Sequence, residues 1–127
     1  MKRIGANGTI RYYDRKEQLH RASGPAVITP EGKLMYYHHG KLHNSNGPAI
    51  IFPNSTQHWY LNGKRHREDG PAIILTNGKQ EWYLNGKRHR ITGPAISFPD
   101  GDGWFYINGI KLTPEEFKMK IFFDRKK

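Results

Sequence analysis

Histidines are the residues of this sequence with the widest chemical range, because imidazole binds metal ions and exchanges protons near neutral pH. Four of the seven recur at steps of 23 residues, at His20, His43, His66 and His89. If each step adds two strands to a sheet, histidines of neighbouring steps lie about 9.6 Å apart. Bonds from a metal ion to an imidazole nitrogen are only about 2.1 Å long, so neighbouring steps cannot share an ion. We expect these four side chains to pack against aromatic rings, and we predict no metal site.

Two other histidines, His38 and His39, are adjacent, and adjacent residues of a regular strand point to opposite faces. They are therefore not expected to bind an ion together. Catalytic patterns are missing as well: the chain has no cysteine, its serines stand in no nucleophile motif, and its acidic residues are scattered. No glycine-rich phosphate loop precedes a helix. The chain is predicted not to be an enzyme, with no catalytic residue, no cofactor and no small-molecule substrate.

Tyrosines and arginines form a second recurring set. An aromatic residue followed by tyrosine keeps the 23-residue step, and in two of the steps arginines follow the tyrosine. Tyrosine beside arginine can stack nucleobases and contact phosphates, and both residue types are enriched at the energetic centres of protein interfaces. The ordinary alternative is that arginine stems lie over tyrosine rings on a solvated surface. We predict a partner-binding set made of Tyr37, Tyr60, Tyr83, Tyr106, Arg65, Arg67, Arg88 and Arg90.

The charge balance is compatible with an anionic partner, and solubility alone is the ordinary alternative. The 127 residues carry 21 Lys and Arg against 11 Asp and Glu, which gives a formal net charge of +10. Such a positive field attracts nucleic acid, anionic lipid or an acidic protein patch. The lack of cysteine fits a reducing compartment, and no apolar run resembles a signal peptide or a membrane span. A cytoplasmic protein is therefore expected.

Gly-Pro-Ala marks the start of each repeat. It occurs at Gly24, Gly47, Gly70 and Gly93, and an incomplete copy precedes the first of them. Repeats of this length indicate stacked supersecondary units, each too small to bury its apolar residues alone. Residues 1–112 are therefore interpreted as one array of about four and a half copies.

Asn-Gly pairs within each copy predict tight hairpin turns, because both residues tolerate positive φ. In the copy that starts at Gly70, such pairs stand at 77–78 and 85–86, with an apolar strand before the first and an aromatic strand between them. Proline cannot donate to a sheet ladder, so residues 87–98 are interpreted as one strand kinked at 93–94. Each copy then contributes two strands.

Turn length decides which side chains share a face of the sheet. A two-residue turn at 77–78 places Ile73 opposite Trp82, and one at 85–86 places Tyr83 opposite Arg88. The tryptophans then lie with the aliphatic residues, and the tyrosines lie with the arginines on the exposed side. The predicted core face consists of Val27, Tyr36, Ile50, Phe52, Trp59, Leu61, Ile73, Leu75, Trp82, Leu84, Ile96, Phe98, Phe105 and Ile107.

The C-terminal residues follow a different pattern. Thr113 and Glu116 form a capping box at the start of a helix, with proline at the first helical position. Phe117 and Ile121 are four residues apart and therefore lie on one side of that helix. Repeat arrays need capped ends, so residues 113–127 are predicted to form a short capping helix and a basic tail.

The repeat resembles the MORN type. Its pattern is Asn-Gly-Lys-Arg-His, a Gly turn, an apolar strand, Asn-Gly or Asp-Gly, and an aromatic strand. Residues 62–66 and 85–89 carry the resemblance best, and Pro-Asp-Gly-Asp at 99–102 matches that family's turn. The resemblance covers residues 1–112 and indicates a divergent relative, similar to Gly-Pro-Ala repeat proteins of phages and giant viruses. It implies an elongated hairpin sheet used as a scaffold or docking surface for protein partners or acidic phospholipid.

The sequence thus predicts an all-β fold, an elongated antiparallel sheet of 23-residue β-hairpin repeats with a short C-terminal capping helix. We expect a non-catalytic module that binds a macromolecule, with an acidic protein surface as the favoured partner. The viral resemblance suggests an accessory protein that docks on or inhibits a host protein in the host cytoplasm. Sequence-independent binding of nucleic acid through the Tyr and Arg set is the alternative. Acidic phospholipid is third, because the tail helix is short for a membrane anchor. A homodimer is left open.

Overall fold

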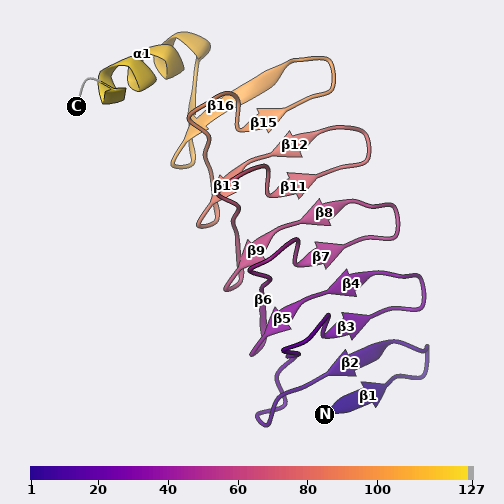
Figure 1. Cartoon of the computed structure of the whole chain (residues 1–127). Helices are drawn as coiled ribbons and strands as arrows, with labels where there is room; N and C mark the ends of the chain where they lie inside the picture. Colours follow the sequence, from indigo (N-terminus) through magenta and orange to yellow (C-terminus); the bar gives the residue numbers. More distant parts are fainter. Residues whose placement is uncertain (126–127) are drawn as a thin grey trace.

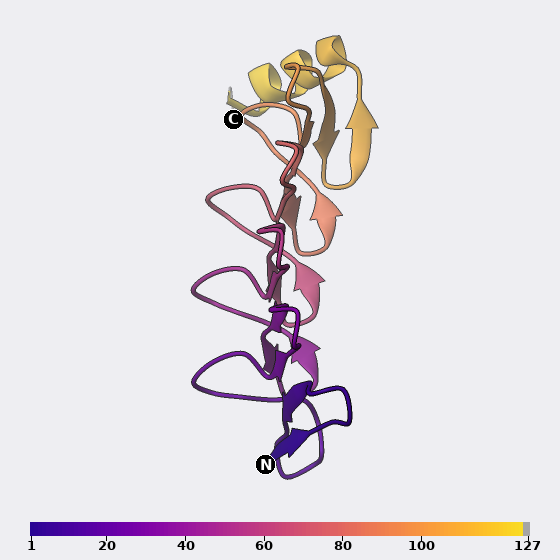
Figure 2. The same ribbon diagram turned by 90° about the vertical axis from the view of Figure 1, so that its right-hand side faces the viewer.

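The computed structural model describes residues 1–125, and it confirms the predicted all-β repeat array with a helix at its C-terminal end (Figure 1). One antiparallel sheet of 11 strands runs the length of the array, and three two-stranded hairpins accompany it. In the side view the copies stack one above another in a thin array, and loops project from one side of it (Figure 2). Among residues 1–125, no helix has the length and apolar character needed to cross a bilayer.

The strands of the long sheet, in spatial order, are β1 (Lys2–Ile4), β2 (Ile10–Tyr12), β3 (Val27–Ile28), β4 (Leu34–Met35), β7 (Ile50–Ile51), β8 (Gln57–His58), β11 (Ile73–Ile74), β12 (Gln80–Glu81), β15 (Ile96–Ser97), β16 (Gly103–Ile107) and β17 (Ile110–Leu112). The three hairpins pair β5 (Tyr37–His38) with β6 (Lys41–Leu42), β9 (Tyr60–Leu61) with β10 (Lys64–Arg65), and β13 (Tyr83–Leu84) with β14 (Lys87–Arg88). The helix is α1 (Pro114–Arg125).

Each of the first three full copies has four short strands and the last has three, so the prediction of two long strands per copy is wrong. The chain changes partners in the middle of each predicted strand. The N–H of Trp82 donates to the carbonyl of Ala95 in the next copy (2.7 Å), and the carbonyl of Trp82 accepts from the N–H of His89 in its own hairpin (3.0 Å). The predicted strand over 87–98 is likewise divided into β14 and β15, with a loop between them. Each copy thereby belongs to the long sheet and to a hairpin at the same time.

The core follows the Gly-Pro-Ala signature. Proline has no N–H to donate, so the ladder begins at the alanine, whose small side chain lets neighbouring strands approach closely. The N–H of Ala72, for example, donates to the carbonyl of Glu81 (2.8 Å), and its own carbonyl accepts from Trp59 (2.6 Å). The alanine of each copy has no exposed surface, and the β-branched residue after it is almost as buried. These residues are Ala26, Ala49, Ala72, Ala95, Val27, Ile50, Ile73 and Ile96.

The two Asn-Gly turns of a copy differ in length. At 85–86 both residues have positive φ, 50° and 83°, as a two-residue hairpin turn requires, and Tyr83 pairs with Arg88 as predicted. At 77–78 only Gly78 has positive φ, and the N–H of Leu75 donates to the carbonyl of Lys79 (3.0 Å). This is a three-residue loop whose last residue is the left-handed glycine.

The longer loop shifts the pairing by one residue, so Ile73 lies opposite Glu81 and not opposite Trp82. A shift of one residue moves every side chain of a strand to the other face. Tyr83 consequently lies with the isoleucines: Ala72, Ile73 and Tyr83 form a buried cluster against which Trp59 packs. The predicted division into a tryptophan core and an exposed tyrosine face is therefore wrong.

Helix α1 begins where the capping box predicts. The N–H of Glu116 donates to Thr113 Oγ1 (3.1 Å), and the N–H of Thr113 donates to Glu116 Oε1 (2.8 Å). The hydrogen bond from the N–H of Thr113 to the Glu116 carboxylate is the first cause that lowers the pKa of Glu116, and the Thr113 side chain acts in the same direction. Phe117 is buried and packs on Phe105 of β16, with ring centroids 4.5 Å apart. The helix therefore covers the last strands of the array, whereas the final residues of the predicted basic tail, 126–127, lie outside the described residues.

Candidate partner-binding face and histidine contacts

One face of the long sheet combines aromatic and basic side chains, and we call it the aromatic–basic face. It is the face onto which the buried β-branched residues of the core project. Seven cation–π contacts connect its members, with distances from cation to ring centroid of 4.5 to 5.9 Å. Its members are Lys33, Phe52, His58, Tyr60, Arg65, Lys79, Tyr83, Arg88, Phe98, Trp104, Tyr106 and Lys111.

Tyrosines and arginines alternate along this face. Arg65 Cζ lies 5.8 Å from the ring of Tyr60 in its own hairpin and 5.6 Å from the ring of Tyr83 in the next copy. Arg88 repeats the arrangement, at 5.9 Å from Tyr83 and 5.4 Å from Tyr106. The predicted opposition of tyrosine and arginine is therefore confirmed for these two arginines. We call the series the Tyr–Arg ladder.

The ladder does not extend to the first full copy. Tyr37 pairs with Leu42 in its hairpin, where the second and third copies have arginine and the last has lysine. Of the four predicted tyrosines, Tyr37 is thus the one placed beside an aliphatic partner. Burial raises its pKa, and the nearby Tyr60 acts in the same direction.

Tyr83 is a buried member of the ladder, with 7 % of its surface exposed, so the prediction that it is an exposed contact residue is wrong. Its hydroxyl donates to Glu81 Oε1 (3.2 Å), and Glu81 also lies 3.7 Å from both Lys79 and Arg88. Burial raises the pKa of Tyr83, and the neighbouring Glu81 acts in the same direction. Tyr83 therefore anchors the ladder to the sheet, while Arg88, with 41 % of its side chain exposed, reaches the surface.

Arg67 and Arg90 lie on the opposite side, against the prediction. Arg67 Cζ stacks 3.8 Å above the ring of Trp59, and its Nη1 donates to the carbonyl of Pro71 (3.2 Å). Arg90 covers Trp82 in the same way, at 3.9 Å from the ring. The strand before each arginine ends two residues earlier, so the alternation of faces no longer holds there. These two arginines stabilise the bend into the next copy and cover the tryptophans.

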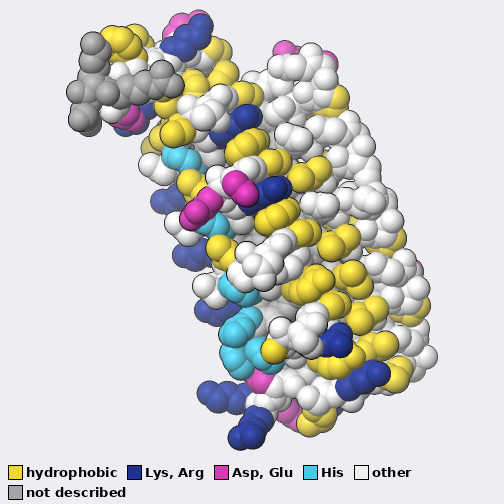
Figure 3. Space-filling view, in the orientation of Figure 1, with side chains coloured by type: hydrophobic (Ala, Val, Ile, Leu, Met, Phe, Trp, Pro, Cys, Tyr) yellow, Lys and Arg dark blue, Asp and Glu magenta, His cyan; other side chains and the backbone are white. Residues whose placement is uncertain are grey.

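The four recurring histidines connect each copy to the next. Nδ1 of His66 accepts a hydrogen bond from the backbone N–H of Asn85, 19 residues later (2.9 Å). The other three do the same at 3.0 Å: His20 with His39, His43 with Asn62, and His89 with Asn108. Histidine side chains accordingly follow one edge of the array (Figure 3). We call these contacts the histidine links; the sequence predicted a structural role but not this partner.

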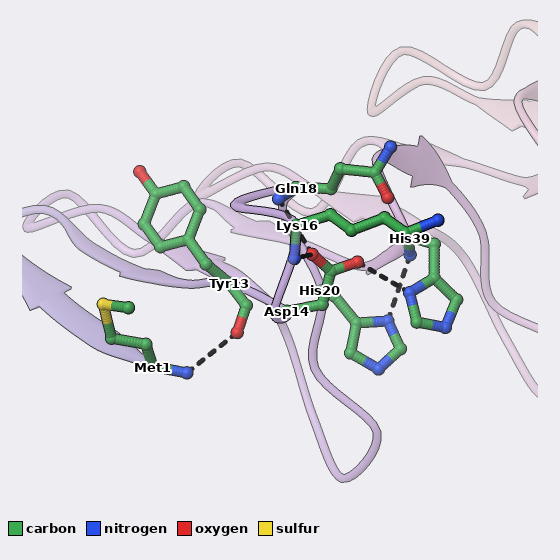
Figure 4. A network of polar contacts seen from close by, with 7 residues as sticks. All are labelled: Met1, Tyr13, Asp14, Lys16, Gln18, His20 and His39. Atoms are coloured by element: carbon green, nitrogen blue, oxygen red, sulfur yellow. Dashed lines mark hydrogen bonds and ion pairs between the residues drawn. The ribbon is translucent and has the colours of Figure 1, made fainter.

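His38 ends β5 and His39 begins the tight turn after it, so the expected separation of their side chains onto opposite faces of a regular strand is wrong. His39 has a φ of 47°, and its ring lies 4.4 Å from that of His38 and stacks on that of His20 at 4.0 Å. His39 Nδ1 lies 2.7 Å from Asp14 Oδ2 (Figure 4). That hydrogen bond, followed by one from the N–H of Gln18, lowers the pKa of Asp14 to about 2.

Acid is expected to destabilise the fold through His58. Burial is the first cause that lowers its pKa below the ordinary 6.5, the charges of Arg65 and Lys33 lower it further, and Glu81 acts in the opposite direction. The folded state then holds fewer protons than the unfolded state, so stability is full above about pH 6.5 and is lost as pH falls towards the lowered pKa. We expect a lower midpoint of urea unfolding at about pH 5.5 than at about pH 7.5. His58→Met, which introduces the residue of the preceding copy, should reduce this difference; an unchanged difference would contradict the assignment.

The fold and the aromatic–basic face define a β-hairpin repeat protein. The side chains that recur in each copy stack on aromatic rings or form contacts between neighbouring copies. Comparisons with protein-family models, with curated proteins and with solved structures find no match to this chain.

Proposed function

We propose that the chain is a non-catalytic module that binds a macromolecular partner with an acidic surface through its aromatic–basic face. The observation that carries the proposal is the concentration of cation–π pairs on one face of the repeated sheet. Within residues 1–125 the acid on this face is Glu81, which is buried and lies near Lys79 and Arg88. The face is therefore positive and aromatic, a combination common at the centres of protein interfaces.

The ring contacts favour a protein over a nucleic acid. Nucleobases bind to aromatic side chains by stacking on a free ring face. Here Arg65, Arg88 and Lys79 lie over the rings of the face, so a base would first have to displace a cation. An acidic protein surface needs no such displacement, because carboxylates can meet the outward edges of the same guanidinium groups.

Nucleic-acid binding is the second candidate, and Trp104 is the residue that favours it. It is the exposed ring of the face, at 46 %, so a base finds more free ring surface here than at the other rings, and Lys111 Nζ, 4.5 Å from the ring, could contact a phosphate. The resemblance to viral repeat proteins suggests the biological role within this proposal. The module would be an accessory protein in the host cytoplasm that docks on or inhibits a host protein.

Two charge-reversal variants test the proposal. The first replaces Lys33, Lys79 and Lys111 of the aromatic–basic face with Glu. The matched control replaces Lys41, Lys64 and Lys87, three exposed lysines that directly follow the tight turns of the hairpins and belong neither to the ladder nor to the aromatic–basic face. Both variants change the net charge equally, so a difference between them locates the binding face.

Binding is measured by fluorescence anisotropy against a labelled poly-glutamate peptide and a labelled single-stranded oligonucleotide over a series of salt concentrations. We expect the first variant to lose at least about tenfold in affinity for the acidic peptide and the control to change much less. Equal losses in both variants would reduce the effect to net charge and overturn the proposal. Preferential binding of the oligonucleotide, with a steep dependence on salt, would favour the second candidate.

A further inference from the structure

The first full copy departs from the others at its tight turn. The later copies have an aliphatic residue and asparagine there, at Leu61 and Asn62 in the second copy, and the same pattern recurs in the third and fourth. The first copy has His38 and His39. Asparagine suits the positive φ of this position and the aliphatic residue suits the hairpin, so the fold does not require histidine at either position.

His38 and His39 both contact a third histidine, His20. His20, which belongs to the incomplete copy, stacks on His39 and lies edge-on to His38, with ring centroids 5.0 Å apart. One ligand nitrogen from each of His20, His38 and His39 lies within 4.8 Å of the others. Nitrogens that share a tetrahedral ion at bonds of about 2.1 Å are about 3.4 Å apart, and His38 and His39 are exposed, so small rotations of their side chains can close the difference.

Asp14 orients the ring of His39, one of these three histidines. Its carboxylate lies 2.7 Å from Nδ1 of His39 and therefore accepts the proton of that nitrogen, which leaves the Nε2 lone pair free. In Figure 4 the second ring nitrogens of His20 and His39 both point away from Asp14 towards the same side. A carboxylate behind a histidine ligand is the usual arrangement around bound zinc, where it fixes the ring and makes the nitrogen more basic.

We propose that His20, His38 and His39 bind one divalent transition-metal ion of the class that prefers imidazole, such as Zn²⁺ or Ni²⁺, with Asp14 holding His39. The ion completes its coordination with water. This site was not expected from the sequence, because both adjacent histidines were expected on one regular strand, whereas His39 lies in the turn that follows it.

Metal binding competes with the first histidine link. Nδ1 of His20 accepts the N–H of His39, so the proton of its neutral ring is on Nε2. To bind an ion through Nε2, His20 must move that proton to Nδ1 and turn its ring away from the N–H of His39. The ion thus replaces the hydrogen bond between the incomplete copy and the first full copy with a bridge between the same two segments.

The test is calorimetric titration of the full chain, without a histidine tag, with ZnCl₂ and NiCl₂ at about pH 7.5, where imidazole is neutral. We expect one equivalent to bind with micromolar affinity. The variant His38→Leu with His39→Asn, which restores the residues of the later copies, should abolish binding without lowering the melting temperature in EDTA. Asp14→Asn should weaken binding about tenfold or more. His89→Asn, which removes a recurring histidine far from the cluster, should bind as the parent does.

Nuclear magnetic resonance gives an independent readout. Zinc should shift the His39 backbone amide and change the tautomer of His20 in the parent, and should do neither in the double variant. Metal binding that survives in the double variant, or that is lost equally in His89→Asn, would assign the ion to other groups and overturn the proposal. An absence of binding to the parent at millimolar zinc would overturn it as well.

Discussion

Trp82→Ala is expected to lower the free energy of unfolding by about 3 kcal/mol, at the low end of the range for truncating a large aromatic side chain. The indole is half-buried beneath Arg90, whose guanidinium lies 3.9 Å from the ring centroid. Removal of the ring exposes neighbouring apolar surface and leaves Arg90 without its stacking partner. Because the Trp82 backbone joins the long sheet to the hairpin, loosening this position should weaken the contact with the next copy and the hairpin of its own copy at once.

The measurement is urea unfolding followed by circular dichroism, with Trp104→Ala as the matched control. Trp104 is 46 % exposed, so its removal should change stability by less than half as much. Trp82→Phe, which introduces the residue of the last copy, should retain most of the stability. If Trp82→Ala and Trp104→Ala unfold at the same midpoint, the bent strand does not depend on the stacking of arginine on tryptophan.

Ile96→Ala is the second large effect, and we expect a loss of about 2–4 kcal/mol. Ile96 is 2 % exposed and lies in β15 between Glu81 of β12 and Trp104 of β16. A cavity at this position cannot collapse easily, because regular backbone ladders fix the strands on both sides.

The same unfolding experiment measures this loss against two related variants. Ile96→Val should cost about 1 kcal/mol, since valine occupies the equivalent position of the first full copy. Ile110→Ala removes the same side chain at a position that is 65 % exposed, and it should be nearly neutral. Equal losses at positions 96 and 110 would show that burial along the Gly-Pro-Ala strands does not determine stability.

Much of the fold could be predicted because it depends on local signals that recur. The spacing of Gly-Pro-Ala gives the copy length, the Asn-Gly pair at 85–86 gives its hairpin, and the capping box at Thr113 gives the helix start. The register between the two strands on either side of residues 77–78 could not be predicted from local signals. An Asn-Gly pair fits both a two-residue turn and the end of a three-residue loop, and only the surrounding sheet decides between them.

The prediction of the partner-binding residues depended on the same register around residues 77–78. A one-residue shift exchanged the faces, which moved Tyr83 into the core and brought Lys33, Lys79 and Trp104 onto the aromatic–basic face. Arg67 was misplaced for a different reason, because alternation of faces applies only while the strand continues. The histidine links do have a sequence signal, namely the constant separation of 19 residues between each histidine and the first residue of the tight turn in the next copy.

The histidine links make the junctions between copies directional and identical along the array. Each link runs from an acceptor in one copy to a donor in the following copy, so any interior block of 23 residues presents the same two ends to its neighbours. Duplication or loss of a whole block therefore preserves every junction, whereas an insertion between a histidine and the next turn changes the separation of 19 residues that each link requires. The next acceptor in the series would stand at position 112, and leucine occupies it, with the helix directly after. A further copy added after position 112 would therefore have no histidine link to the copy before it.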